Sequence, residues 1–390
     1  MSSIEKPTHS EPIGPFNNVL YIRHRGQFRG ATTDGGAFSV PYEITVPQTP
    51  GGRVFVFEPP HLFSGLIARH NLLGEDFLFN LGYSHASCGF GSRGLHILDP
   101  TVKFELKIRD QVIKLPLDPE EPEVLDLNIM RQFAFALRQS TAFGEVNRVY
   151  AVGFSESGAT VHEVYGQFGH KFFDLTFAGT AEYREPVRIR DQNPIMIFNT
   201  EMDFDARAIP NPNFPAYQYY AIPGGPHIPD AALTRVAFDG SPGPNIAGTT
   251  PINWLLIARG LFKSGDEWIR NGKRPPRSAT LQLNSRGEIM RDDRQNALGG
   301  IRHPALELRE ARFIASPGRN GFALFGDYRN PRQLTDSEYP VYVKAFVQAT
   351  DALFDAGYLL PAGRDRLHRE AQLKRPNTYT LNYREGLLLR

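Results

Sequence analysis

The segment Gly153–Gly158 (G-F-S-E-S-G) has the residue types and spacing best suited to covalent chemistry in this chain. It places a serine among small residues, between an apolar strand-like run and a helix-like run, which is the pattern of a nucleophile elbow. Such a sharp turn holds the serine in a strained conformation with its hydroxyl clear of the sheet. The next amide and the positive end of the helix face the same space and can stabilise an oxyanion. Ser155 is therefore the predicted nucleophile, and the Glu156 amide is a predicted oxyanion donor.

Two other interpretations of this segment remain open. Ser157 is an alternative nucleophile, because S-E-S-G-A also resembles the motif. The strand-like run ends at Phe154, however, which is two residues too early for Ser157. An ordinary strand–helix turn without a catalytic role is the other alternative, and the strong strand and helix patterns on both sides favour the elbow.

An elbow predicts an acid and then a histidine further along the chain, each after a later strand. The strand-like run Pro194–Asn199 leads into Glu201 and Asp203, and Tyr217–Ile222 leads into a Gly-rich loop that ends at His227. Both predicted positions are therefore filled. A loop histidine without a role is the alternative for His227, since the chain has 11 histidines.

The identity of the acid is open at this stage. Asp203 lies several residues beyond the strand end, which is the usual offset, and it is the favoured candidate. Glu201 comes two residues earlier, and its longer side chain can reach the same imidazole. The carboxylate that is not the acid is expected to brace the loop with a hydrogen bond.

A second oxyanion donor is expected from the loop after the strand-like run Arg53–Phe57. This loop reads E-P-P-H-L, and its prolines have no N–H group. The backbone amides of His61 and Leu62 are therefore the candidates.

The segment Gly89–Gly94 matches the GxGxxG pattern of dinucleotide-binding loops. That site would need a helix directly afterwards, but Pro100 and strand-like residues follow. The segment is better interpreted as a loop at the mouth of a site. No cofactor is expected.

The elements around these residues predict an α/β fold. The first hundred residues contain strand-like runs at Asn18–Arg25 and Phe38–Val46, and from Val146 onward strands alternate with helices. Such alternation is typical of a mostly parallel, twisted sheet with helices on both faces. The segment 277–331 is rich in Gly, Asn, Arg and Pro and is expected to be irregular. Further expected elements are helices at 66–81, 124–137, 158–168, 252–271 and 341–356, strands at 83–88 and 172–178, and a hairpin at 101–115.

The length of 390 residues suits one large domain over residues 1–390, with an insertion or cap-like addition within 230–335. Charges nearly cancel, with 43 basic and 42 acidic residues, so no basic excess favours nucleic acid or an anionic membrane. A lone cysteine, Cys88, excludes an intrachain disulfide and CxxC zinc sites. No ligand cluster at metal spacing is evident. The N-terminus lacks the pattern of a secretory signal, and no stretch of about 18 apolar residues occurs, so a cytoplasmic protein is expected.

Several strings together resemble a bacterial group of α/β-hydrolase-domain proteins with a G-x-S-[QE]-S-G elbow. They are G-F-S-E-S-G at Gly153, T-E-x-D at Thr200, G-x-x-H ending at His227, W-I-R-N-G-K-R-P-P at Trp268, G-G-I-R-H-P at Gly299 and A-L-F-D-A-G-Y-L-L-P at Ala352. The resemblance covers most of the chain. It implies an α/β-hydrolase fold and ester hydrolysis, with Ser155 as nucleophile, His227 as base and the acid in the Glu201/Asp203 segment. The group usually has Gln where this chain has Glu156.

In G-G-I-R-H-P, two glycines permit close backbone approach and Arg302 follows directly. Arg302 is a candidate to bind a substrate carboxylate, although an arginine that bonds loop carbonyls is the favoured interpretation.

Together these patterns predict a metal-free serine esterase that acts on a small-molecule ester through an acyl-enzyme. Alternatives are an acyltransferase or lyase that uses the same triad, or a non-catalytic binding protein on the same fold. The oligomeric state and the substrate are not predicted by the sequence.

Overall fold

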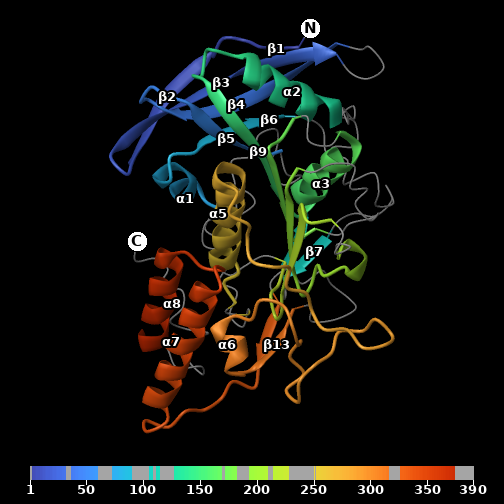
Figure 1. Cartoon of the computed structure of the whole chain (residues 1–390), viewed down its shortest axis with the longest axis vertical. Helices are drawn as coiled ribbons and strands as arrows, with labels where there is room; N and C mark the ends of the chain where they lie inside the picture. Colours follow the sequence, from blue (N-terminus) through green and yellow to red (C-terminus); the bar gives the residue numbers. More distant parts are fainter. Residues whose placement is uncertain are drawn as a thin grey trace. The chain divides into compact units, whose positions relative to one another are not determined.

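The computed structural model describes residues 2–31, 37–59, 73–89, 105–108, 111–114, 127–168, 172–181, 193–209, 214–227, 250, 252–315 and 326–373 (Figure 1). The chain folds into two compact units. The first comprises Met1–Glu105, Ile113–Ala181 and Pro186–Ile195, and the second comprises Leu106–Val112, Glu182–Glu185 and Met196–Arg390. That residues 1–390 form one large domain stays a prediction.

The first unit is built on a mixed sheet. Its strands are β1 (Ser3–Ile4), β2 (His9–Phe16), β3 (Val19–Ala31), β4 (Ala37–Pro47), β5 (Arg53–Phe57), β6 (Ser84–Cys88), β9 (Val146–Phe154) and β10 (Leu175–Gly179). They lie in the order β1-β3-β4-β6-β5-β9-β10, with β2 also paired to β3. Pairing is antiparallel from β1 to β6 and parallel among β6, β5, β9 and β10. The N-terminal meander is thus followed by a parallel centre.

The parallel centre is covered by helices. From Tyr150 to Phe154 every residue of β9 is buried, as expected for a strand with both faces covered. Helix α3 (Glu156–Phe168) packs on β9 and β10 (Figure 1). Its buried residues Val161, Val164 and Tyr165 recur at helical spacing and form its inner face. This unit also contains α1 (Glu75–Asn80) and α2 (Leu127–Gln139).

In the second unit β11 (Ile195–Thr200) and β12 (Tyr217–Ile222) are neighbouring strands. Helix α5 (Leu255–Asn271) has a largely buried first half and ends at Gly272, which has a φ of 69°. Helices α7 (Tyr339–Asp355) and α8 (Pro361–Leu373) lie side by side (Figure 1). The smaller elements of this unit are η3 (Ala206–Ala208), α6 (Pro304–Glu307), and β13 (Arg312–Ile314) with β14 (Asp327–Arg329). A separate two-stranded sheet pairs β7 (Glu105–Ile108) with β8 (Gln111–Lys114).

Comparison with the sequence confirms the α/β class, the β-rich N-terminal part and the alternation of strands and helices. The described part of segment 277–331 is mostly irregular as predicted, although it also contains α6, β13 and β14. The sequence missed β1, β2 and α8. Residues 66–72 of the predicted helix at 66–81 lie outside the described residues, and the described remainder contains α1. The GxGxxG segment beyond Gly89 also lies outside them.

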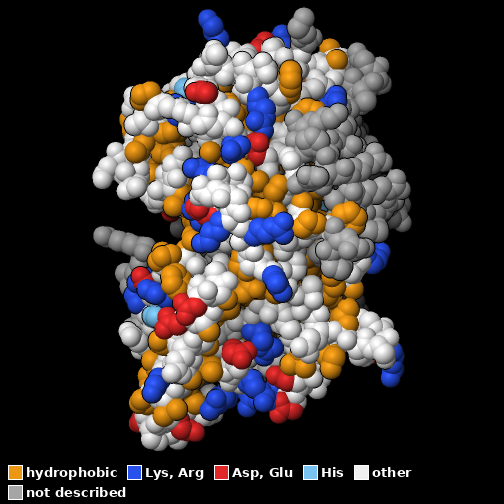
Figure 2. All heavy atoms as spheres, in the orientation of Figure 1, with side chains coloured by type: hydrophobic (Ala, Val, Ile, Leu, Met, Phe, Trp, Pro, Cys, Tyr) orange, Lys and Arg blue, Asp and Glu red, His pale blue; other side chains and the backbone are white. Residues whose placement is uncertain are grey.

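The surface that Figure 2 shows carries acidic and basic side chains interspersed with one another. Among the residues that the structure describes, no helix has both the length and the apolar character that a bilayer crossing requires.

Two helical glycines predict stability changes of opposite sign. A Cβ on Gly260 in α5 would lie 2.3 Å from the Tyr358 carbonyl oxygen, so Gly260→Ala should destabilise the protein despite alanine's higher helix propensity. A Cβ on Gly166 in α3 meets nothing within 4 Å, so Gly166→Ala should raise the free energy of unfolding, by about 0.5–1 kcal/mol. Denaturant midpoints measure both. Equal effects of the two substitutions would contradict this packing.

Candidate active site

Ser155 occupies a strained turn between β9 and α3. Its φ is 58°, which is uncommon for a residue other than glycine. Its backbone N–H donates to the Gly179 carbonyl oxygen at 2.9 Å and to Thr180 Oγ1 at 3.2 Å, both at the end of β10. Thr180 also has a positive φ, of 48°. The neighbouring strand therefore holds Ser155 in a conformation that costs about 1–3 kcal/mol when unsupported.

Two positions of the elbow, Gly153 and Gly158, require glycine because backbone atoms of other residues approach them closely. A Cβ on Gly153 would lie 2.2 Å from the Ser157 carbonyl oxygen, and a Cβ on Gly158 would lie 2.6 Å from the Gly179 carbonyl oxygen. Contacts this short do not occur in folded proteins, so both positions accept glycine only. The spacing of small residues in the sequence follows from this geometry.

Ser157, the alternative nucleophile, is buried and bonded within the turn. Its Oγ donates to the Phe154 carbonyl oxygen at 2.9 Å and accepts from the Phe154 N–H at 2.9 Å. Ser155 is less deeply buried. The geometry therefore favours Ser155 as the nucleophile and assigns Ser157 to bracing the elbow.

Oxyanion donors were predicted on two segments. Glu156 is the first residue of α3, and the first N–H groups of a helix have no intrahelical acceptor. Its amide is thus suitably placed on the chain to stabilise an anion beside Ser155. His61 and Leu62 lie outside the described residues, and only Glu58 and Pro59 of their loop are described.

Asp203 and His227 form a buried hydrogen-bonded pair in the second unit. His227 Nδ1 lies 2.7 Å from Asp203 Oδ1, and the two side chains are 9% and 6% exposed. A short bond from Nδ1 to a carboxylate fixes the orientation of the imidazole and leaves Nε2 as its second nitrogen. The structure thus brings together the predicted histidine and the favoured predicted acid.

The Asp203 side chain is fixed by the residues that precede it. Its Oδ2 accepts from Thr200 Oγ1 at 2.7 Å, and its backbone carbonyl accepts from Asn199 Nδ2 at 2.8 Å. Both partners are fully buried at the end of β11. These bonds set the direction of Oδ1 toward the imidazole.

A tight turn after β12 brings His227 to the pair. Pro223 and Gly224 are its central residues, the Gly224 φ is 69°, and Gly225 N–H donates to the Ile222 carbonyl at 3.3 Å, as in a type II turn. Beyond the turn, Trp254 Nε1 donates to the Pro226 carbonyl oxygen at 3.0 Å. This hydrogen bond from a fully buried tryptophan holds the chain directly before His227.

Glu201 does not bond the imidazole in the described structure. Its Oε2 accepts from the Gly224 N–H at 2.7 Å, and its Oε1 pairs with the Arg291 guanidinium at 2.7 Å. With both oxygens occupied, Glu201 connects the loop after β11 that carries Asp203 (the acid loop) to the turn at Pro223 and Gly224 that precedes His227 (the histidine turn). This is the bracing role that the sequence left open for one of the two carboxylates.

Arg302 bonds within its own loop. Its guanidinium donates to the Ala297 carbonyl oxygen at 2.6 Å and the Leu306 carbonyl oxygen at 3.3 Å, and it pairs with Glu307 at 2.6 Å. The preceding Gly300 lies against β12, where an added Cβ would be 2.5 Å from the Ala221 carbonyl oxygen. A substrate-binding role for Arg302 stays a prediction, and its contacts are those of a structural arginine.

Four contributing residues were missed in the sequence: Thr180, Thr200, Trp254 and Arg291. Thr200 could have been found, because it begins the T-E-x-D segment. Arg291 carries no local signal, since it lies 90 residues from its partner Glu201 (291 − 201). Within the described part of the chain, no group of three or more His, Cys, Asp or Glu side chains is arranged to hold a metal ion.

Comparison with known proteins now gives the family. A family model described as "Alpha/beta hydrolase domain" matches residues 95–369, which is more than half of the chain. The chain belongs to this α/β-hydrolase family. The fold predicted from the sequence is thereby confirmed. No curated protein matches the chain.

Among solved structures, the α/β-hydrolase chain is distantly similar to several ester hydrolases. An α-amino acid ester hydrolase matches at 16% identity and a TM-score of 0.27, over 41% of this chain and 25% of that one. A bacterial brefeldin A esterase matches at 11% identity and 0.26, over 41% and 40%. The esterase of the archaeon Pyrobaculum calidifontis matches at 12% identity and 0.29, over 46% and 65%. The chain thus spans less than two thirds of each, and similarities this distant transfer no activity.

Buried Glu58, at the start of the candidate oxyanion loop, predicts a pH-dependent stability. Burial raises its pKa from 4.5 to about 7, partly offset by His85, whose Nε2 lies 3.6 Å away. Because the pKa of Glu58 is raised in the folded protein, its protonated carboxyl contributes its full stabilisation below about pH 4.5. This contribution is lost as the pH rises through about 7. Glu58→Gln removes this ionisation. Between pH 5 and pH 8 the free energy of unfolding of the wild type should therefore fall by roughly 1–3 kcal/mol more than that of the variant. Chemical denaturation at both pH values measures it. Parallel pH dependences would refute the burial of an ionising Glu58.

Proposed function

We propose that this protein is a serine esterase that hydrolyses a small-molecule carboxylic ester. The observation that carries the proposal is the backbone of Ser155, a non-glycine residue held at a φ of 58° directly before α3. An ordinary strand–helix turn gains nothing from such strain, whereas a nucleophile gains exposure of its hydroxyl beside a helix N-terminus. The buried Asp203–His227 pair supplies the matching base and acid.

The proposed reaction proceeds through an acyl-enzyme. His227 Nε2 accepts the Ser155 hydroxyl proton while Ser155 Oγ attacks the ester carbonyl carbon. The Glu156 amide, with an amide from His61 or Leu62, stabilises the resulting oxyanion. When the intermediate collapses, the C–O bond to the alcohol breaks and the alcohol takes the proton from His227. Water then gives a proton to His227 and attacks the acyl carbon, which releases the acid and restores the Ser155 hydroxyl.

Asp203 is the proposed acid of this triad. Because its Oδ1 accepts the Nδ1–H of His227, it holds the tautomer whose Nε2 is a base, and it stabilises the imidazolium that forms. Glu201 is the proposed brace, since both of its oxygens already have partners. Membership of the α/β-hydrolase family supports the hydrolase assignment at the level of fold.

The two serines of the elbow predict opposite outcomes. Ser155→Ala should abolish turnover of p-nitrophenyl esters and leave the denaturation midpoint near the wild-type value, since it removes only the nucleophile. Ser157→Ala should retain activity but lower the free energy of unfolding by about 1–3 kcal/mol, because it removes the bonds that brace Phe154. Turnover and denaturation of both variants decide between them. Near-wild-type turnover by Ser155→Ala, with loss in Ser157→Ala, would reverse the assignment.

The two carboxylates predict unequal losses of kcat. Asp203→Asn presents an amide to Nδ1 and favours the wrong tautomer, a change that costs ~10⁴-fold in kcat in the worked serine protease case. Glu201→Gln keeps an acceptor for the Gly224 N–H and should lose roughly tenfold through its weakened pairing with Arg291. Both kcat values are measured on one ester at saturating concentration. A larger loss in Glu201→Gln would make Glu201 the acid and Asp203 the brace.

A further inference from the structure

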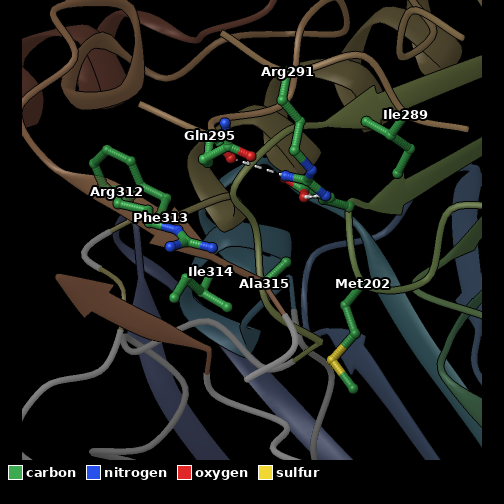
Figure 3. A pocket seen from close by; sticks show the side chains of 9 residues that line it. Met202, Ile289, Arg291, Gln295, Arg312, Phe313, Ile314 and Ala315 are labelled. Carbon is green, nitrogen blue, oxygen red and sulfur yellow. Dashed lines mark hydrogen bonds and ion pairs between the residues drawn. The ribbon is translucent and has the colours of Figure 1, made fainter. Parts of the chain in front are cut away.

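A cavity of about 300 Å³ lies in the second unit beside the acid loop. Three segments far apart in the sequence form its walls: the acid loop, the turn after Ile289, and β13 (Figure 3). Its size falls at the lower end of the range for small-molecule sites. The lining residues are Glu201, Met202, Ile289, Arg291, Gln295, Arg312, Phe313, Ile314 and Ala315.

The two arginines of the cavity differ in their partners. Arg291 is engaged, by Glu201 at 2.7 Å and by the Gln295 carbonyl oxygen at 3.1 Å. Arg312 has no ion pair or hydrogen bond with any residue that the structure describes, and Figure 3 draws no interaction from its guanidinium. Among the described lining residues the charges are therefore two positive and one negative. Arg312, an exposed residue, therefore lines the cavity without a counter-charge among the described residues.

The walls that carry the arginines are fixed to each other. Fully buried Asn296 donates through Nδ2 to the Ala311 carbonyl oxygen at 2.9 Å and accepts through Oδ1 from the Phe313 N–H at 2.8 Å. Asp292 Oδ1 closes the turn by accepting from the Asn296 N–H at 2.9 Å. The segments of Arg291 and Arg312 thus form one preorganised frame, and a preorganised site loses less free energy on binding.

Apart from the charged residues and Gln295, the lining is apolar. Met202 and Ile289 come from two walls, and Phe313, Ile314 and Ala315 follow Arg312 on the third. An inorganic anion gains nothing from such surface, whereas a small organic acid can bury its hydrocarbon part there. A guanidinium also matches a carboxylate with two parallel hydrogen bonds. Arginine and apolar walls together fit an organic carboxylate.

We propose that this cavity binds the carboxylate of a small organic acid, with Arg312 as its cationic ligand. The site adjoins the candidate acid, because Glu201 and Met202 directly precede Asp203 and Glu201 also bonds the histidine turn. A ligand in the cavity therefore contacts the loop that carries the acid of the triad.

Calorimetric titration of the full chain with sodium pentanoate tests the site without catalysis. Arg312→Gln should weaken pentanoate binding about tenfold to hundredfold, as expected for loss of a charged hydrogen-bonding partner. Arg286→Gln makes the same charge change on an exposed turn outside the lining and should bind like the wild type. Arg312→Lys keeps the positive charge but lacks the paired N–H donors of a guanidinium, so its affinity for pentanoate should lie between those of Arg312→Gln and Arg286→Gln. Pentanamide and inorganic phosphate should bind more weakly than pentanoate.

Equal pentanoate affinity in the wild type and Arg312→Gln would overturn the site, as would equal losses in Arg312→Gln and Arg286→Gln. Phosphate that binds as tightly as pentanoate would overturn the assignment to an organic acid.

Discussion

The conformation of one residue, Ser155, constrains much of the first unit. A positive φ at a serine is stable only where the surroundings impose it, and here the end of β10 does so by accepting the Ser155 N–H. That bond requires β10 to pass close to the first turn of α3, which leaves no room for a side chain at Gly158. Burial of β9 and the packing of α3 across β9 and β10 support this arrangement.

A second constraint organises the second unit. The Asp203–His227 pair is buried, and a buried polar pair stabilises a fold only when its remaining hydrogen-bonding groups have partners. Thr200 and Asn199 satisfy Asp203 on one side, while Glu201 and Trp254 hold the histidine turn on the other. Glu201 also bonds Arg291, so the same network extends into the wall of the cavity. The proposed acid, the proposed base and the proposed anion site are therefore parts of one hydrogen-bonded structure.

Local patterns in the sequence predicted most of what depends on local physics. The elbow, the strands that precede the acid and the histidine, and the C-terminal limit of α5 at Gly272 all follow from short-range rules about small residues, apolar runs and glycine. The choice between Asp203 and Glu201 did not follow, because it depends on whether Arg291 and the Gly224 amide occupy one carboxylate. The cavity was also missed, since Arg291 and Arg312 meet the acid loop only through tertiary packing. Arg302 was named as a candidate because its motif is visible in the sequence, although a structural role was the favoured interpretation.

Reaction of the protein with a fluorophosphonate, followed over time and mapped by peptide mass, tests the central claim most directly. The reagent phosphonylates a serine only where a base and an oxyanion site act on it. The account predicts one adduct, on Ser155, and a much slower reaction in His227→Ala, because Asp203-bound His227 is the base. An adduct on another serine, or equal rates for the wild type and His227→Ala, would contradict it.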